Sequence, residues 1–183
     1  MLADLAAARV RLMYDVLLIG GPAGVGKSSV GWEISALLKA REVAHCFIEG
    51  DIMDQIHPAP PGDPHRSQIT ERNIAAVWAN YAAVGQTRLI YTNTVSILEA
   101  PMVVRAMGGP GTRVMCVLLT ASEDIVRQRL AEREIGSELD WHIERSALMA
   151  RRLDAQAPEG TIRILTDGMT VTQVAQDICA KWL

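Results

Sequence analysis

A glycine-rich segment near the start of the chain carries residue types whose spacing points directly to phosphate chemistry. Residues 21–28 read Gly-Pro-Ala-Gly-Val-Gly-Lys-Ser, which fits the pattern G-x-x-x-x-G-K-[ST]. Glycines at these positions let the backbone curl so that successive N–H groups point into one concavity and hold phosphate oxygens. Lys27 would reach the terminal phosphates of a nucleoside triphosphate, and the Ser28 hydroxyl would bind the Mg²⁺ that bridges them. The residues predicted to hold the nucleotide are Gly21, Pro22, Ala23, Gly24, Val25, Gly26, Lys27, Ser28 and Ser29.

The residues on either side of this segment predict the elements that must position it. The short apolar run Val16–Ile19 is typical of a buried strand, and apolar residues recur at helical spacing from Lys27 to about Lys39. The positive end of that helix would add to the attraction for phosphate. A glycine-rich turn that only resembles the motif is the alternative, but the fixed positions and the strand–loop–helix setting argue against it. We therefore predict a phosphate-binding loop, or P-loop, at residues 21–28.

An acidic residue follows the second predicted strand, Val43–Ile48. Asp51 lies just beyond the end of this strand, at the edge of a parallel sheet where ligands bind. Phosphoryl transfer needs a group that orients or deprotonates the acceptor hydroxyl, and a carboxylate can do both. We predict that Asp51 is the catalytic base, with Glu49 as the second candidate. The alternative is that Asp51 and Asp54 only cap the segment that follows.

Two arginines lie four residues apart in the most charge-dense part of the chain. Arg129 and Arg133 would share one helix face, next to a segment predicted to form a lid at about residues 134–145. Guanidinium groups stabilise the charge that spreads over a transferring phosphoryl group. We prefer Arg133, then Arg129, as catalytic residues, with Arg145 as the candidate on the far side of the lid. The alternative is a solvated helix face whose charges pair with neighbouring glutamates.

A long loop rich in proline and histidine, residues 57–66, follows the predicted base. Its prolines exclude it from a helix interior or a sheet ladder, and loops of such length in compact domains tend to be functional. His57 and Arg66 lie at the two ends of the loop, and Asn93 ends the third predicted strand at the ligand edge. We predict that these three side chains bind a small-molecule acceptor together with Asp51. The alternatives are a solvated loop and a merely polar strand end.

Strand and helix patterns alternate along the whole chain. Further apolar strands are predicted at residues 89–93, 114–119 and 161–165, and helical patterns separate them. This alternation predicts an α/β fold with a mainly parallel sheet of about five strands and helices on both faces. The length of 183 residues, without an internal repeat or linker, fits a single domain over residues 1–183.

The overall composition and charge limit the kinds of partner that the protein can bind and the cell compartment in which we expect it. A net charge of −3 and a pI near 5.8 argue against a nucleic-acid partner. No uninterrupted apolar run is long enough to span a bilayer, and the first residues lack the basic start of a signal peptide. Three cysteines without metal-ligand spacing are typical of buried, reduced thiols. We expect a cytoplasmic protein that is a monomer or a homodimer and binds no membrane.

Four segments, spread over nearly the whole chain, together match the motifs of one group of proteins. They are Gly21–Ser28, Gly50-Asp51, Val117–Ser122 followed by Arg127–Arg133, and Ile164–Gly168 before the last predicted helix. With these segments the chain resembles the small P-loop kinases that phosphorylate small molecules, such as gluconate, shikimate and adenylylsulfate kinases and chloramphenicol phosphotransferase. The resemblance implies a three-layer α/β sandwich, ATP and Mg²⁺ as cofactors, and a lid in the arginine-bearing segment. It also implies that four residues lie near the adenine and phosphates, namely Arg133, Thr166, Asp167 and Gly168.

The combined hypothesis is an ATP- and Mg²⁺-dependent phosphotransferase that moves the γ-phosphate to a hydroxyl of a sugar, a nucleoside or an antibiotic. Residues 91–93 depart from the glycine-rich substrate loop of shikimate kinases, and residues 134–142 match no specificity signature. The identity of the acceptor is therefore left open. Two other classes also stay open: a nucleotide-binding regulatory module, and an NTPase without a small-molecule acceptor.

Overall fold

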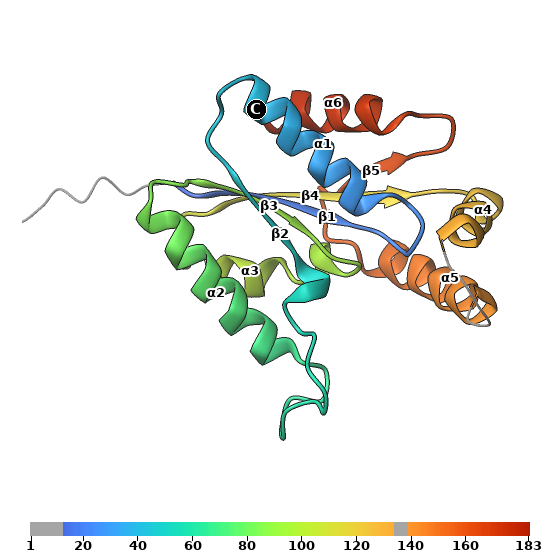
Figure 1. The fold of residues 1–183 in the computed structure, drawn as a ribbon, viewed down its shortest axis with the longest axis horizontal. Helices are drawn as coiled ribbons and strands as arrows, with labels where there is room; N and C mark the ends of the chain where they lie inside the picture. Colours follow the sequence, from blue (N-terminus) through green and yellow to red (C-terminus); the bar gives the residue numbers. More distant parts are fainter. Residues whose placement is uncertain (1–12, 134–138) are drawn as a thin grey trace, which may run out of the picture.

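The computed structural model describes residues 13–133 and 139–183. Within these residues, five parallel strands form one sheet in the order β2-β3-β1-β4-β5 (Figure 1). The strands are β1 (Asp15–Gly20), β2 (Cys46–Glu49), β3 (Arg88–Thr92), β4 (Arg113–Thr120) and β5 (Ile162–Leu165). In the central strand β1, Ile19 lies opposite Thr92 of β3 on one side and Val117 of β4 on the other. The ends of β3 and β4 therefore flank the point where the glycine-rich segment leaves the sheet.

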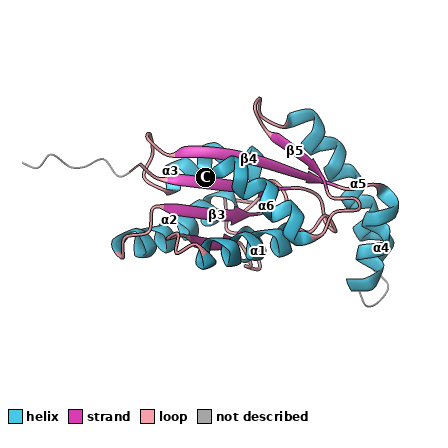
Figure 2. Cartoon of the chain, turned by 90° about the horizontal axis from the view of Figure 1, so that it is seen from above, coloured by secondary structure: helices cyan, strands magenta, loops and turns pink. Residues whose placement is uncertain are grey.

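Helices cover both faces of the sheet and its carboxyl edge. The helices are α1 (Lys27–Ala40), α2 (Ser67–Ala83), α3 (Ala100–Ala106), α4 (Glu123–Arg133), α5 (Leu139–Gln156) and α6 (Val171–Trp182). α1 and α6 lie on one face, α2 and α3 lie on the other, and α4 and α5 lie at the carboxyl end of the strands (Figure 1, Figure 2). Among the described residues, no helix is both long and apolar enough to cross a membrane. The predicted α/β fold with a parallel sheet and helices on both faces is confirmed.

Two apolar clusters hold the central strand in place. Leu17 and Ile19 of β1 pack among residues of α1 and α6, whereas Val16 and Leu18 pack among residues of α2 and α3. All four side chains are fully buried, and the burial of each such side chain contributes about 1.5–3 kcal/mol to stability. A central strand that is covered on both faces reads as an unbroken apolar run, which is why its position could be predicted. This strand gives the loop that follows it a rigid base.

The start of α2 is fixed by a residue that lies outside the helix. Asp63 is buried, and its Oδ2 accepts the backbone N–H groups of Gln68 and Ile69 at 3.0 Å each. These bonds satisfy two of the donors that a first helical turn leaves unpaired. We expect Asp63→Ala to lower the free energy of unfolding by about 1–2 kcal/mol, measured by urea denaturation. Asp63→Asn keeps an acceptor oxygen, so its free energy of unfolding should fall clearly less. An equal decrease in both variants would contradict the capping role.

Candidate active site

The loop between β1 and α1 has a shape that requires glycine at its key positions. Gly21, Gly24 and Gly26 have φ angles of +149°, +84° and +94°. A Cβ atom on Gly21 would also lie 2.5 Å from the carbonyl oxygen of Leu119 at the end of β4. Residues with side chains rarely adopt such φ angles, and a side chain on Gly21 would clash with the β4 backbone. The glycine spacing seen in the sequence is therefore a requirement of this backbone.

Side chains from three elements hold consecutive carbonyl groups of the loop. Lys27 Nζ donates to the carbonyl oxygen of Pro22 at 3.0 Å. Ser146 Oγ on α5 donates to that of Ala23 at 3.0 Å, and Arg129 Nη1 on α4 donates to that of Gly24 at 3.3 Å. A loop with its carbonyls tied back in this way is suited to present N–H groups to an anion on its other side. Ser146 was not predicted, because nothing in the sequence around it marks a contact with a loop 123 residues away.

One cavity brings the loop together with two of the predicted catalytic side chains. It has a volume of about 480 Å³, which lies in the range of small-molecule sites. Its lining residues are Gly24, Gly26, Lys27, Ser28, Ser29, Asp51, Arg129 and Glu132. Lysine, serine, aspartate and arginine side chains thus meet at the carboxyl edge of the sheet, as the sequence predicts. Glu132 was not among the predicted site residues, because the sequence suggested only a surface ion pair for it.

A sharp turn after β2 presents Asp51 to this cavity. Gly50 begins a short 3₁₀ turn, Gly50–Ile52, directly after the strand. A Cβ atom on Gly50 would lie 2.6 Å from Tyr91 Oη, so only glycine lets the chain pass so close to β3. The Asp51 side chain is exposed to the cavity. Glu49, the last residue of β2, does not line the cavity, because the turn ends the extended geometry that would have kept Glu49 and Asp51 on one side.

Arg129 connects α4 with the turn that follows β5. Besides Gly24, its Nη1 donates to Thr166 Oγ1 at 3.1 Å, and Thr166 Oγ1 in turn donates to the carbonyl oxygen of Thr120 at 3.1 Å. The predicted nucleotide residue Thr166 is therefore joined to the P-loop through one guanidinium. Arg133 is the last residue of α4, but its side chain and residues 134–138 lie outside the described part of the chain. The preference for Arg133 over Arg129 stays a prediction.

The other two residues of this turn shape the backbone. Asp167 accepts the backbone N–H of Ser122 with both carboxylate oxygens, at 3.0 and 3.3 Å. Hydrogen bonding from the Ser122 side chain, together with that from its backbone N–H, holds the pKa of Asp167 below its ordinary value. Because Ser122 immediately precedes α4, Asp167 fixes the start of the helix that carries Arg129. Gly168 has a φ of +68°, which lets the chain turn towards α6.

A network at the end of β3 gives Asn93 a role different from the predicted acceptor contact. Asn93 Nδ2 donates to Glu99 Oε2 at 2.9 Å, and Asn93 Oδ1 accepts the backbone N–H of Thr94 at 2.7 Å. Tyr91 Oη also donates to Glu99 Oε2, at 3.2 Å. The Thr94 carbonyl oxygen then accepts the backbone N–H of Gly21 at 3.1 Å. Both polar ends of the Asn93 side chain are thus engaged in positioning the start of the P-loop.

Glu99 is a half-buried acid that sequence reasoning missed, and its environment predicts a pH effect. Burial raises the pKa of Glu99 above its ordinary value, against the opposing hydrogen bonds from Asn93 and Tyr91. From the ordinary glutamate value up to the raised one, the folded protein binds more protons than the unfolded chain does, so stability falls as the pH rises. We expect the free energy of unfolding of the wild type to fall relative to Glu99→Gln as the pH rises above about 4, the ordinary glutamate value. A difference that stays flat or grows over this range would contradict the expectation.

Two predicted acceptor residues lie away from the cavity. His57 and Arg66 lie at the ends of the loop that precedes α2. This loop extends beyond the N-terminal end of α2 (Figure 1). Arg66 has a φ of +58°, and its Nε donates to the carbonyl oxygen of Ile56 at 3.1 Å, which closes the base of the loop. Neither side chain lines the two cavities next to the P-loop that are described in this section. The structure therefore does not bring them to the acceptor side of the site.

A second cavity adjoins the P-loop on the side of Ala23. It has a volume of about 220 Å³ and is lined by Ala23, Thr94, Trp141, His142, Arg145, Ser146 and Met149. The Arg145 guanidinium lies over the Trp141 ring, 5.0 Å from its centroid. The predicted lid residues 139–145 form the first two turns of α5. This helix therefore brings an arginine and an exposed indole ring to the P-loop.

The donor set of the larger cavity suits Mg²⁺. The Ser28 hydroxyl and the carboxylates of Asp51 and Glu132 are oxygen donors, which Mg²⁺ prefers. In the described residues no group of three or more His, Cys, Asp or Glu side chains is arranged as a metal site. This fits an ion that is bound by one or two protein oxygens together with substrate phosphates. Ser28 is the residue that would hold it.

Comparisons with known proteins place the chain by its fold. No protein-family model matches the sequence, and no curated protein matches it significantly. Among solved structures, a gluconokinase from Sinorhizobium meliloti 1021 is similar at a TM-score of 0.58 and 18% identity, over 93% of this chain and 92% of that one. The Deinococcus radiodurans tunicamycin resistance protein has a TM-score of 0.62 at 18% identity, over 92% and 95%.

A shikimate kinase from Acinetobacter baumannii is a third similar structure, with a TM-score of 0.55 at 17% identity over 92% of each chain. These similarities span nearly the whole of each protein. At such sequence identities they show a shared fold but not a shared substrate. In this chain the shared fold joins a parallel sheet, the glycine-rich loop after β1, and helices on both faces. The chain therefore has the fold of the small-molecule P-loop kinases.

Proposed function

We propose that the protein is an ATP-dependent phosphotransferase that moves the γ-phosphate to a hydroxyl group of a small molecule. One observation carries this proposal: a single cavity is lined by P-loop residues, Lys27 and Ser28 among them, and by Asp51. The Asp51 carboxylate can accept the proton of a hydroxyl group, which is the step that transfer to an acceptor adds to nucleotide binding. The fold shared with small-molecule kinases supports the same assignment.

Each side chain has a distinct part in the proposed reaction. Lys27 and the loop N–H groups hold the β- and γ-phosphates, and Arg129, fixed by Gly24 and Thr166, adds positive charge at the cavity wall. Ser28 would hold Mg²⁺, which would supply charge neutralisation for the phosphates. The acceptor oxygen bonds to the γ-phosphorus as the bond from phosphorus to the bridging oxygen breaks. Asp51 takes the acceptor proton, and ADP leaves.

The smaller cavity at Ala23 supports an acceptor that extends towards α5. Ala23 belongs to the P-loop, so this cavity lies next to the proposed nucleotide site. Arg145 offers a cation and Trp141 a flat apolar face there. An acceptor with both a ring and an anionic group would use both. Sugars, nucleosides and antibiotics are the classes to test, and similar structures include a gluconokinase, a shikimate kinase and a tunicamycin resistance protein.

An acceptor panel tests the proposal. ADP formation from Mg·ATP is followed in the presence of hydroxylated acids, sugars, nucleosides and antibiotics, each paired with an analogue that lacks the hydroxyl. We expect one class to raise turnover into the range of small kinases, about 1–100 s⁻¹, and its deoxy analogue to have no effect. ADP formation at the same rate with and without every acceptor would instead favour an NTPase. No ADP formation despite nucleotide binding would favour a regulatory module.

A further inference from the structure

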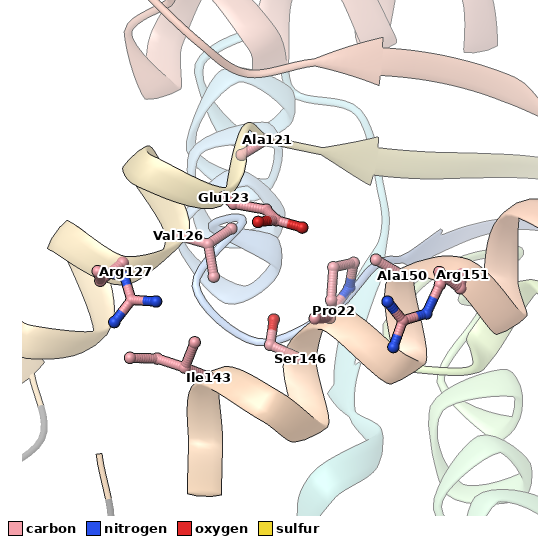
Figure 3. Close-up of a pocket in the computed structure, with 10 residues that line it drawn as sticks. Pro22, Ala121, Glu123, Val126, Arg127, Ile143, Ser146, Ala150 and Arg151 are labelled. Carbon is pink, nitrogen blue, oxygen red and sulfur yellow. The ribbon is translucent and has the colours of Figure 1, made fainter. Parts of the chain in front are cut away.

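A third cavity lies between α4 and α5, on the outer side of the P-loop (Figure 3). Its volume is about 220 Å³. Val126 on α4, Ile143 and Ala147 on α5, and Pro22 of the P-loop are among the residues that form its apolar walls. The cavity shares no lining residue with the larger cavity that contains Asp51. With the second cavity, lined by Trp141 and Arg145, it shares only Ser146, so a ligand here would occupy a space of its own beside the site proposed for phosphoryl transfer.

The size of this cavity limits what it can hold. An apolar cavity of about 150 Å³ binds a molecule as large as benzene. A volume of about 220 Å³ thus accommodates one ring with a short substituent. It is smaller than the sites that enclose a drug-sized molecule, which begin at about 300 Å³. The occupant is therefore a small body with a single ring or a short branched chain.

Charged side chains at the rim define the polar part of the occupant. Arg127 of α4 and Arg151 of α5 lie on opposite sides of the cavity, with Glu123 between them near the start of α4 (Figure 3). Both arginines are exposed, and among the described residues neither makes a hydrogen bond or an ion pair. Two guanidinium groups against one carboxylate leave the rim with a net positive charge. Guanidinium groups bind carboxylate and phosphate with paired, charge-assisted hydrogen bonds.

We propose that this cavity binds a small amphipathic organic anion. Its apolar body lies between α4 and α5, and its carboxylate or phosphate group is bound at the rim, by Arg127 on one side or by Arg151 on the other. The bound molecule also touches the nucleotide loop. Pro22 lines the cavity and accepts a hydrogen bond from Lys27, and Ser146 of the same wall holds the Ala23 carbonyl group. Occupancy is therefore communicated to the P-loop by direct contact.

The test uses the full-length protein and para-ethylbenzoate as the probe, with para-ethylbenzyl alcohol as the neutral match. Binding is followed by an NMR titration that reads the backbone amide signals of Ala147 and Ala150. We expect the benzoate to bind at least roughly tenfold more tightly than the alcohol and to shift the Ala23 signal as well. A phenyl phosphate arm tests whether phosphate serves as well as carboxylate. Equal binding of the acid and the alcohol, or no binding of either, overturns the proposal.

Variants separate this cavity from the P-loop, which also attracts anions. In Arg127→Gln/Arg151→Gln we expect the advantage of the benzoate to be lost, whereas Arg152→Gln keeps it, because Arg152 is the next residue on α5 and does not line the cavity. Ala150→Met fills the cavity and should weaken both probes. Lys27→Ala should bind the benzoate as the wild type does. Loss of binding in Lys27→Ala, with retention in the double arginine variant, would assign the anion to the P-loop and contradict the proposal.

Discussion

Replacing Lys27 by alanine will reduce phosphoryl transfer by roughly 10²–10³-fold. The ammonium group lies in the cavity with Ser28 and Asp51 and is held beside the loop by the Pro22 carbonyl oxygen at 3.0 Å. In the proposed reaction it supplies positive charge where negative charge shifts during transfer, a part that a water molecule cannot take over. The measurement is the acceptor-dependent rate of ADP formation, together with the dissociation constant for Mg·ATP.

Lys39→Ala is the matched control for this variant. Lys39 lies in the last turn of the same helix, is exposed and does not line the cavity. It should turn over ATP like the wild type, and both variants should keep the far-UV circular dichroism of the parent. An unaltered rate in Lys27→Ala would remove the P-loop from the mechanism. A rate that fell equally in both variants would indicate a general effect of lost positive charge.

Asp51→Asn is expected to lower acceptor-dependent turnover by roughly 10²–10⁴-fold while it leaves nucleotide affinity nearly unchanged. The substitution keeps the size of the side chain and the backbone contacts of the turn at Gly50–Ile52, but an amide accepts no proton. The effect should fall on kcat, because a base acts in the transition state and contributes little to binding of ATP. Steady-state kinetics with saturating Mg·ATP and varied acceptor measure it.

Asp54→Asn tests whether the loss is specific to this carboxylate. Asp54 lies three residues further along the chain and does not line the cavity, so its variant should stay within about threefold of the wild type, as surface changes away from a site usually do. If Asp51→Asn and Asp54→Asn were equally active, Asp51 would be a polar residue of the turn and the base would have to be sought elsewhere. Glu132, which lines the same cavity, would be examined next.

Local features of the sequence were enough to predict the framework and the P-loop. β1 and β4 read as apolar runs because both faces of the sheet are covered, and the loop is encoded in eight neighbouring residues. Glycine was required there by the backbone itself, as the approach of Gly21 to Leu119 shows. Chemistry that depends on a contiguous segment can be inferred without knowing how distant parts of the chain meet.

Side-chain contacts between distant segments could not be predicted in this way. Asn93 has the residue type and the position expected of a ligand contact. In the structure its amide group instead forms hydrogen bonds with Glu99 and with the backbone of Thr94. Likewise, Ser146 reaches the Ala23 carbonyl group only because α5 folds back over the P-loop. A side chain with hydrogen-bonding groups can pair with many kinds of donor and acceptor. Only the tertiary packing decides which of them it meets.

The proline-rich loop shows a related limit. Its composition predicted a surface loop correctly, because proline cannot join a helix interior or a sheet ladder. Composition says nothing about the direction in which a loop leaves the sheet, so only the structure could show that His57 and Arg66 do not line the two cavities described above at Asp51 and at Trp141. The first turns of α5, with Trp141 and Arg145, instead line a cavity together with Ala23 of the P-loop.

The fate of the γ-phosphate tests the central claim most directly. ATP labelled at the γ-phosphate is incubated with the protein, Mg²⁺ and the acceptor that raises turnover, and the label is separated into inorganic phosphate and organic phosphate ester. The account predicts that the label appears in an ester of the acceptor, in equal amount to the ADP formed, and that Asp51→Asn and Lys27→Ala suppress it. Label released as inorganic phosphate, at a rate that no acceptor changes, would contradict it.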